Sequence, residues 1–216
     1  AYAATSKDKT LEKYTSVLRE NVEELNGLIQ EILDFRKAED AGFSHTHIRR
    51  VSVSSLLRTQ FEWFYPLSEQ HQIQFKIDAP KELYWNTDSV YFKKILANLI
   101  SNAFKYTEDG GTVRISLHEE ENFLVLKVYN TGKGIEEADM QNIFDRYHIL
   151  STMDNDDNRQ NTARNGLGLF ICHSLVQSLG GKIDIESEVG QYAEFTVTLP
   201  FGIVEESSDD TIDEDI

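Results

Sequence analysis

The sequence predicts an α+β protein, a two-layer α/β sandwich whose mixed sheet is covered on one face by three helices and preceded by a long amphipathic helix. Near the N-terminus, apolar residues recur three and four positions apart, as on one face of a helix. Further along, several segments alternate apolar and polar residues, which is typical of half-buried strands. Helical patterns separate these segments, and this order favours one sheet with helices packed on it.

Residues 1–42 are predicted to form a long helix from a helical bundle. Its apolar stripe has the spacing of a heptad seam with one polar interruption: Leu11, Tyr14, Leu18, Asn21, Leu25, Leu28, Ile32 and Phe35. A lone helix cannot bury such a stripe, so it needs a partner helix or, alternatively, its own domain. Asp40-Ala41-Gly42 then ends the helix.

A second domain is predicted over residues 43–203, beginning with a strand within 47–53 and a helix over 54–70. The helix carries an inward apolar face made of Leu56, Leu57, Phe61, Phe64 and Leu67. The strand that follows alternates at Ile73, Phe75 and Ile77. Asn86-Thr87-Asp88 then offers capping side chains for the next helix.

This next helix separates an apolar stripe from a polar face. The stripe contains Phe92, Leu96, Leu99 and Ala103. Asn98, Asn102 and Lys105 stack on another side, because a helix advances about 3.6 residues per turn. Asparagine costs roughly half a kcal/mol in a helix interior relative to alanine, so two of them one turn apart require a reason: a ligand or, alternatively, hydrogen bonds within the helix. Carboxamide oxygens suit Mg²⁺ and a lysine balances phosphate charge, which predicts a metal–polyphosphate ligand.

The middle of the domain predicts two more strands and a short helix. Residues 113–117 and 124–128 alternate apolar and polar side chains and are joined by a polar turn at 118–122. A short helix is expected around 137–146. These elements extend the sheet that the first strands begin.

A polar stretch, residues 148–165, interrupts the domain after the short helix. It predicts a flexible lid over a nucleotide or, alternatively, a surface insertion. A helix over 167–179 follows. A hairpin of strands 182–187 and 192–199, turning around Gly190, completes the domain.

Two glycine motifs follow the asparagine helix. The first reads Asn130-Thr131-Gly132-Lys133-Gly134-Ile135, and the second reads Asn165-Gly166-Leu167-Gly168-Leu169. Glycine lets backbone N–H groups approach phosphates or a base without obstruction. The second motif opens a predicted helix, and a helix N-terminus is a natural anion site.

In this order the motifs resemble the ATP-binding domain of bacterial sensor histidine kinases, within the GHKL ATPase superfamily. Residues 92–107 resemble the family's N box and 130–135 its first glycine box. Ile143-Phe144-Asp145-Arg146-Tyr147 resembles the F box, and residues 166–169 resemble the second glycine box. The resemblance runs from about residue 11 to 200, so the first helix resembles the second dimerisation helix of these kinases.

The resemblance implies catalytic roles for Asn98, Lys105 and Arg146 in a kinase that uses ATP and Mg²⁺. Asn102 and Asn98 would hold Mg²⁺ against the phosphates. Lys105 would contact phosphate oxygens, and Arg146 would neutralise phosphate charge.

Other residues of the resembling motifs are expected to bind the nucleotide. Asn130 would face the adenine edge, with Gly132 and Gly134 shaping that wall. Arg164 would add positive charge. The remaining expected contacts are Tyr106, Ile135, Tyr147, Gly166, Leu167, Gly168 and Leu169.

Histidine kinases transfer the γ-phosphoryl group to a histidine on the first dimerisation helix. No histidine of this chain has the expected sequence context: His45, His47, His71, His118, His148 and His173. We therefore expect the first helix to lie outside this chain, which would bind ATP but not phosphorylate itself.

Three departures from the family pattern predict weak ATP binding. Asn130 replaces the usual aspartate, Arg164 replaces a glycine, and Tyr192 with Ala193 replaces small residues of the last glycine box. An amide in place of the carboxylate loses a charge-assisted hydrogen bond, roughly 1 kcal/mol. The expected dissociation constant is roughly tens to hundreds of micromolar.

The alternatives belong to other function classes. ATP-driven clamps of the gyrase, chaperone or mismatch-repair type carry a general-base glutamate where this chain has Asn98, which cannot accept a proton. An anti-sigma-type serine kinase would lack the heptad helix. A degenerate nucleotide-binding module that serves as a dimerisation and signalling scaffold remains the second reading.

Composition sets limits on partners and location. The net charge of −16 argues against nucleic acid binding, and residues 204–216 read as an acidic disordered tail or linker. No apolar run is long enough for a membrane segment, and the single cysteine, Cys172, predicts a buried structural thiol. By the resemblance, the parent protein would be a homodimer formed through a helical bundle. It would act on a response-regulator receiver domain. This chain would be the cytoplasmic portion of an inner-membrane sensor protein of the hybrid class.

Overall fold

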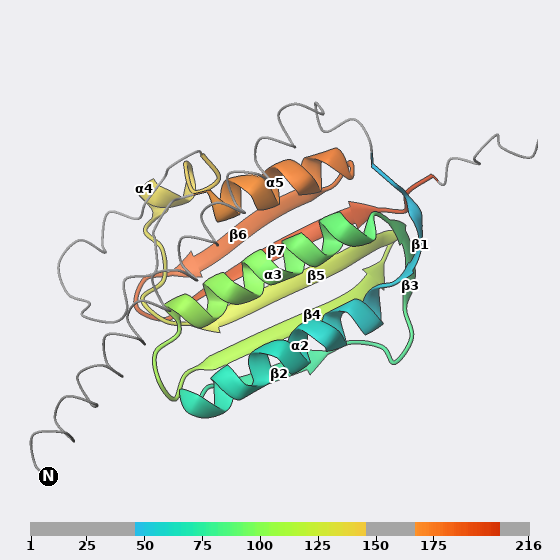
Figure 1. Ribbon diagram of the computed structural model, residues 1–216. Helices are drawn as coiled ribbons and strands as arrows, with labels where there is room; N and C mark the ends of the chain where they lie inside the picture. Colours follow the sequence, from blue (N-terminus) through green and yellow to red (C-terminus); the bar gives the residue numbers. More distant parts are fainter. Residues whose placement is uncertain (1–45, 146–166, 204–216) are drawn as a thin grey trace, which may run out of the picture.

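The computed structural model describes residues 46–145 and 167–203 of the chain. A five-stranded sheet lies behind three long helices, α2, α3 and α5, which all cover the same face (Figure 1). This arrangement confirms the predicted two-layer sandwich. The elements are β1 (Arg49–Ser52), α2 (Val53–Gln70), β2 (Gln74–Asp78), β3 (Tyr84–Thr87), α3 (Ser89–Tyr106), β4 (Thr112–Glu120), β5 (Phe123–Thr131), α4 (Glu137–Met140), α5 (Gly168–Ser178), β6 (Lys182–Glu188) and β7 (Tyr192–Pro200).

The main sheet is mixed, with strand order β2-β4-β5-β7-β6. β2 runs parallel to β4, and the other neighbouring strands are antiparallel. β1 and β3 pair with each other in a separate two-stranded sheet at one end of the sandwich (Figure 1). β3 is a strand that the sequence pattern does not predict.

The core lies between the main sheet and the helices. Alternate residues of β4, β5 and β7 are buried against the apolar stripe of α3, as strand and helix periodicity require. Burial of each large side chain stabilises the fold by roughly 1.5–3 kcal/mol. The fully buried residues of α3 are Phe92, Ile95, Leu96, Leu99 and Ile100.

One predicted core residue, Leu67, is exposed (37%), so that prediction is wrong. Ser68 takes the inward position instead, in line with Leu57, Phe61 and Phe64 along α2. The Ser68 hydroxyl donates to the Tyr65 carbonyl oxygen (2.6 Å), which satisfies the buried polar group.

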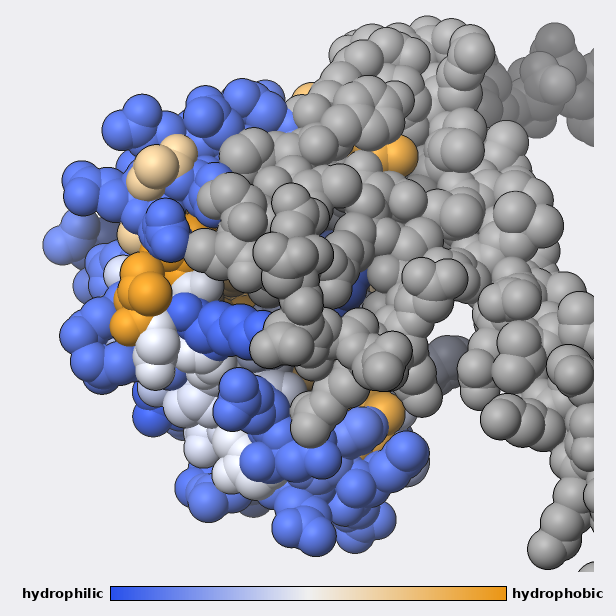
Figure 2. Space-filling model, turned by 90° about the vertical axis from the view of Figure 1, so that its left-hand side faces the viewer, coloured by the Kyte–Doolittle hydropathy of each residue, from blue (hydrophilic) through white to orange (hydrophobic). Residues whose placement is uncertain are grey.

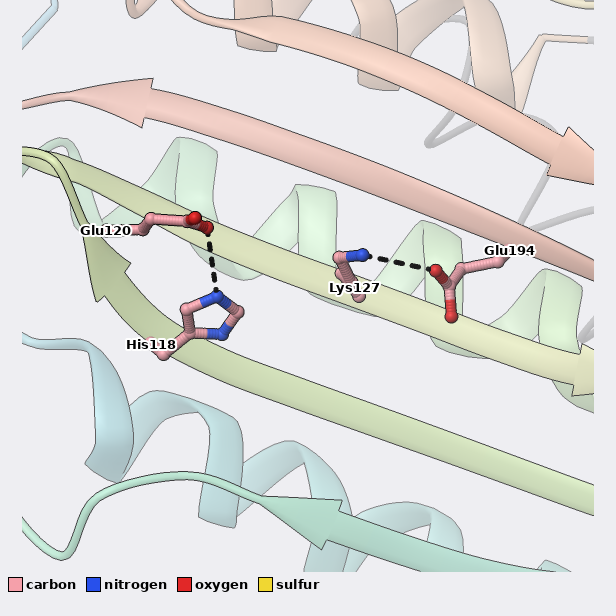
Figure 3. A network of polar contacts seen from close by, with 4 residues as sticks. All are labelled: His118, Glu120, Lys127 and Glu194. Carbon is pink, nitrogen blue, oxygen red and sulfur yellow. Dashed lines mark hydrogen bonds and ion pairs between the residues drawn. The ribbon is translucent and has the colours of Figure 1, made fainter.

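The β4–β5 hairpin turns more tightly than the sequence predicts. Its loop consists of Glu121 and Asn122, which both have positive φ (49° and 68°), as in a type I′ turn. His118 and Glu120, predicted to lie in the turn, belong to β4. Their side chains lie on the face of the sheet away from α3, where His118 Nε2 is 3.5 Å from Glu120 Oε2 (Figure 3).

Cys172 is fully buried in α5 and has no disulfide partner. Burial raises the pKa of its thiol to about 12, because the apolar surroundings disfavour the thiolate. The prediction of a buried structural thiol is confirmed. Within residues 46–145 and 167–203, no helix is both long and apolar enough to cross a membrane.

Several predictions concern residues outside the described ranges. The heptad helix over 1–42, the lid over 148–165 and the acidic tail over 204–216 all fall there. The two predicted boundaries, after residue 42 and after residue 203, therefore stay predictions.

Candidate nucleotide-binding site

The asparagine helix is α3, which begins at a strong cap. The Asp88 carboxylate oxygen Oδ1 accepts hydrogen bonds from the N–H groups of Val90 (2.8 Å) and Tyr91 (3.1 Å), confirming the predicted cap. The apolar stripe of α3 faces the core. The side chains of Asn98 and Asn102 are left half-buried beside that stripe.

Lys105 lies exposed in the last turn of α3. Its ammonium nitrogen is 5.7 Å from the centre of the Tyr106 ring, within the range of a cation–π contact. The cation thus lies one turn beyond Asn102, at the same end of the sandwich. The roles of Asn102 as metal ligand and of Lys105 as phosphate contact stay predictions.

The second glycine motif meets α3 at Asn98. A Cβ atom on Gly168, the first residue of α5, would lie 3.1 Å from Asn98 Oδ1. The N-terminus of α5 is therefore directed toward the polar face of α3. Leu167 is buried and Leu169 is partly buried against the core, so both leucines anchor the start of α5, and their contact with a nucleotide stays a prediction.

Asn130 lies at the end of β5 on the helix-covered face, where it follows the buried residues Leu126 and Val128. It is only 5% exposed. Its amide nitrogen donates to the Thr131 carbonyl oxygen (3.2 Å). This polar group is thus placed at the edge of the apolar core.

The first glycine motif packs closely on its neighbours. A Cβ atom on Gly132 would lie 2.2 Å from the Tyr106 carbonyl oxygen, so this glycine lets the loop touch the end of α3. Gly134 has a φ of +65°, and a Cβ atom there would lie 2.2 Å from the Glu188 carbonyl oxygen. These contacts explain both glycines without a ligand, and their predicted place beside adenine stays a prediction.

Ile135 is buried, and its N–H donates to the Ser187 hydroxyl (2.9 Å). The Ser187 hydroxyl in turn donates to the Tyr192 carbonyl oxygen (2.6 Å). Ser187 therefore fastens the first glycine motif to the β6–β7 hairpin. Nothing in the sequence singles out this serine, because one polar residue near a strand end has no distinctive pattern.

Tyr192 does not enter the candidate site. Its ring stacks on Tyr129 on the open face of the sheet, with ring centres 5.5 Å apart and planes at 24°. Ala193, its neighbour, lies on the helix-covered face and is buried. The departure at position 192 therefore changes the opposite face of the sheet from the one that carries Asn130.

The motifs gather at one end of the sandwich, where α3 ends, α5 begins and α4 lies (Figure 1). Figure 2 turns this end toward the viewer and shows a largely hydrophilic surface around a small group of hydrophobic residues. Four predicted site residues lie outside the described ranges, namely Arg146, Tyr147, Arg164 and Gly166.

Comparison with known proteins agrees with this geometry. Residues 87–203, more than half of the chain, match the family described as histidine kinase-, DNA gyrase B- and HSP90-like ATPase. The chain belongs to this family.

Among curated relatives, the sensor protein SrrB of Staphylococcus aureus is 30% identical over 196 residues, which is 91% of this chain and 33% of that protein. The chain thus spans about a third of the length of the curated relatives it matches. Full-length ShkA in complex with AMPPNP is similar in structure, with a TM-score of 0.73, 25% identity, and coverage of 90% of this chain and 40% of that one.

Two further histidine kinases share the fold. The kinase AdeS of Acinetobacter baumannii has a TM-score of 0.68 at 20% identity, covering 88% of this chain and 84% of that one. ThkA in complex with the response regulator TrrA has a TM-score of 0.69 at 23% identity, covering 89% and 52%. Residues 87–203 are thus an ATPase domain of this family, of the kind that these histidine kinases contain.

The polar side chains of the candidate site fit a Mg²⁺ ion that is shared with nucleotide phosphates. Among the described residues, no group of three histidine, cysteine or acidic side chains could hold a metal ion alone. A metal ion here would have the carboxamides of Asn98 and Asn102 as protein ligands, and would need phosphate oxygens and water to complete its shell. Mg²⁺ fits such a set, because it favours few protein ligands and retains waters.

Proposed function

We propose that this chain binds Mg-ATP and transfers its γ-phosphoryl group to a histidine on a dimerisation helix of the intact protein. The observation that carries the proposal is the meeting of two motifs far apart in sequence. Gly168, the first residue of α5, lies against Asn98 on the polar face of α3. Packing alone does not require half-buried carboxamides at that place.

The proposed roles follow from the chemistry of each group. Asn98 and Asn102 would hold Mg²⁺, which neutralises phosphate charge when it is bound. Lys105 would hold a phosphate oxygen. The N–H group of Gly168, at the start of an eleven-residue helix, would face another. Catalysis would consist mainly of positioning and charge neutralisation.

Three further nucleotide contacts rest on the predicted motifs. Asn130 would accept a hydrogen bond from the adenine amino group through its amide oxygen. Arg146 and Arg164 would neutralise phosphate charge. The absence of a carboxylate at position 98 disfavours activation of water, so transfer to a protein side chain is the better reading.

The setting in the intact protein is also a proposal. We expect a homodimer formed through a helical bundle, with this part on the cytoplasmic side of an inner-membrane sensor. The partner would be a receiver domain, as the complex of the related ThkA with response regulator TrrA suggests.

Titration calorimetry with AMPPNP tests nucleotide binding. We expect a dissociation constant of roughly tens to hundreds of micromolar with Mg²⁺, and much weaker binding when EDTA removes it. No heat at millimolar nucleotide would refute the proposed site.

Label transfer tests the reaction. With radiolabelled ATP, we expect acid-labile label on a separate bundle that bears the acceptor histidine, and none on the 216-residue chain itself. Label on the chain alone would contradict the missing-acceptor reading.

A second candidate, the nucleotide-binding scaffold without transfer, is favoured by one observation. Asn130, which is predicted to face adenine, is an amide where the family usually has an aspartate. Position 192 does not support this candidate, since Tyr192 lies on the open face. AMPPNP binding without any label transfer to the acceptor bundle would favour the scaffold.

A further inference from the structure

The segments that lead into and out of the described domain meet at one place, the strand β3 and the residue after it. β1, at the start, pairs antiparallel with β3. At the other end, the Gly202 N–H donates to the Asn86 carbonyl oxygen (3.0 Å), and the Asn86 amide donates back to the Gly202 carbonyl oxygen (3.1 Å). Both segments are therefore fixed on residues that immediately precede α3.

The trailing segment, which follows β7, is held by close packing as well as by hydrogen bonds. A Cβ atom on Gly202 would lie 2.7 Å from both the Asn86 carbonyl oxygen and a methyl carbon of Ile48. The indole N–H of Trp85 donates to the Pro200 carbonyl oxygen (3.0 Å). The leading and trailing segments are thus in direct contact through Ile48 and Gly202.

Asp88 links this junction to the asparagine helix. It is 4% exposed, and its two carboxylate oxygens have separate tasks. Oδ1 caps α3 through Val90 and Tyr91, while Oδ2 accepts the N–H of His47 (2.9 Å), which lies 41 positions earlier in the chain. A serine or an asparagine would cap the helix equally well, but neither has a second acceptor oxygen in this place.

We propose that Asp88 is a positioning residue that couples the segment before the domain to the nucleotide helix. A helix rises about 1.5 Å per residue, so Asn102 lies roughly 20 Å along the same α3 from Asp88. Because α3 is packed as a rigid element, an adjustment at its capped end moves its carboxamides with it. By reciprocity, nucleotide binding strengthens the His47 bond and the β1 pairing. This inference rests on the proposed function, since it needs a nucleotide at the other end of α3.

Hydrogen exchange read by mass spectrometry tests the coupling on the 216-residue chain. We expect saturating Mg-AMPPNP to slow exchange in residues 46–52 by roughly fivefold, although they lie at the far end of α3 from the carboxamides. Unchanged exchange there, in a sample whose calorimetry shows binding, would overturn the inference and leave the proposed function intact. No binding at all would overturn the proposed function first.

A matched pair of variants isolates the hydrogen bond. His47→Ala and His47→Pro both remove the exposed imidazole, but only proline removes the backbone N–H that Asp88 accepts. We expect the nucleotide effect on residues 46–52 to persist in His47→Ala and to vanish in His47→Pro. Asp88→Asn, which keeps a capping oxygen but turns an N–H₂ group toward His47, is expected to behave like His47→Pro.

The intact sensor protein supplies a kinetic readout. In self-phosphorylation, we expect His47→Pro and Asp88→Asn to lower kcat roughly tenfold and to raise the KM for ATP by at most roughly fivefold, the size of the coupling, because α3 and its carboxamides are displaced together. Equal kcat in His47→Ala and His47→Pro, or a loss confined to KM, would contradict a positioning role.

Discussion

The two faces of the five-stranded sheet use the same strands for different purposes. On the helix-covered face, β5 presents buried apolar residues and then Asn130. On the open face the same strand presents Lys127, which pairs with Glu194 of β7 at 3.4 Å (Figure 3), and Tyr129, which stacks on Tyr192. Neighbouring residues of one strand therefore serve different roles, and the proposed nucleotide site lies on the covered face.

The contact of Gly132 with α3 belongs to the covered face and gives the largest expected effect. Gly132→Ala places a Cβ atom 2.2 Å from the Tyr106 carbonyl oxygen, so the backbone must shift and the free energy of unfolding should fall by roughly 3 kcal/mol or more. Gly190→Ala is the control. It has open space around the new atom but a φ of +78°, and should lose only about 1 kcal/mol. Urea denaturation measures both, and equal losses would remove the steric argument.

The carboxamides of α3 come next in expected effect. Asn102→Ala should weaken Mg-AMPPNP binding by roughly 30-fold, about 2 kcal/mol, because a ligand to a charged group is lost. Calorimetry measures the affinity, and circular dichroism confirms that the helix persists. Ser101→Ala, at an exposed neighbouring position of α3, should bind like the parent chain. Unchanged affinity in Asn102→Ala would place the metal elsewhere.

Substitution of Asn130 is expected to raise the affinity for ATP instead of lowering it. Asn130→Asp should tighten ATP binding by roughly fivefold, about 1 kcal/mol, since a carboxylate accepts the adenine amino proton through a charge-assisted bond that outweighs the lost donation to the Thr131 carbonyl oxygen. Inosine triphosphate has no such amino group, and its affinity should not improve. Equal gains for both nucleotides would mean that position 130 acts through general electrostatics.

Substitution of Tyr192 tests the open face of the sheet, at nearly the same level along the strands as Asn130. Tyr192→Ala should leave the dissociation constant of AMPPNP within about twofold, and lower stability by roughly 1 kcal/mol through loss of the stack on Tyr129. A large loss of affinity would show that the two faces are not independent.

The ion pair on the open face has the smallest expected effect. A double-mutant cycle on Lys127→Ala and Glu194→Ala should give a coupling energy of about 0.2–1 kcal/mol, which falls with added salt because the pair is partly exposed. Nucleotide affinity should not change in any of the three variants. A salt-independent coupling would argue that the pair is shielded from solvent.

Sequence alternation predicted most of the sheet correctly, because β4, β5 and β7 each bury one face and expose the other. It placed the β4–β5 turn wrongly for the same reason. His118 and Glu120 are polar because they lie on the open face, and polarity alone does not tell an exposed strand position from a turn. The sequence pattern does not predict β3, because four residues with one buried tryptophan are too few to show the alternation of a strand.

The residues of the candidate site also differ in how far the sequence predicts their positions. Periodicity was enough to put Asn98 and Asn102 on one side of α3, since three-residue and four-residue spacing is a local property. The direction of Tyr192 depends on the register of β7 against β5, which is a long-range property. Likewise, the closeness of Gly132 to Tyr106 follows from how a loop returns to a helix end, and no local pattern encodes it.

The burial of Cys172 has a practical consequence for labelling experiments. With a thiol pKa of about 12 and no solvent exposure, it offers almost no thiolate to alkylating reagents at pH 8. It is also the single cysteine of the chain. A dye or spin label attached to a new cysteine, for example at the exposed Trp63 of α2, would therefore report from one known position without prior removal of the native sulfur.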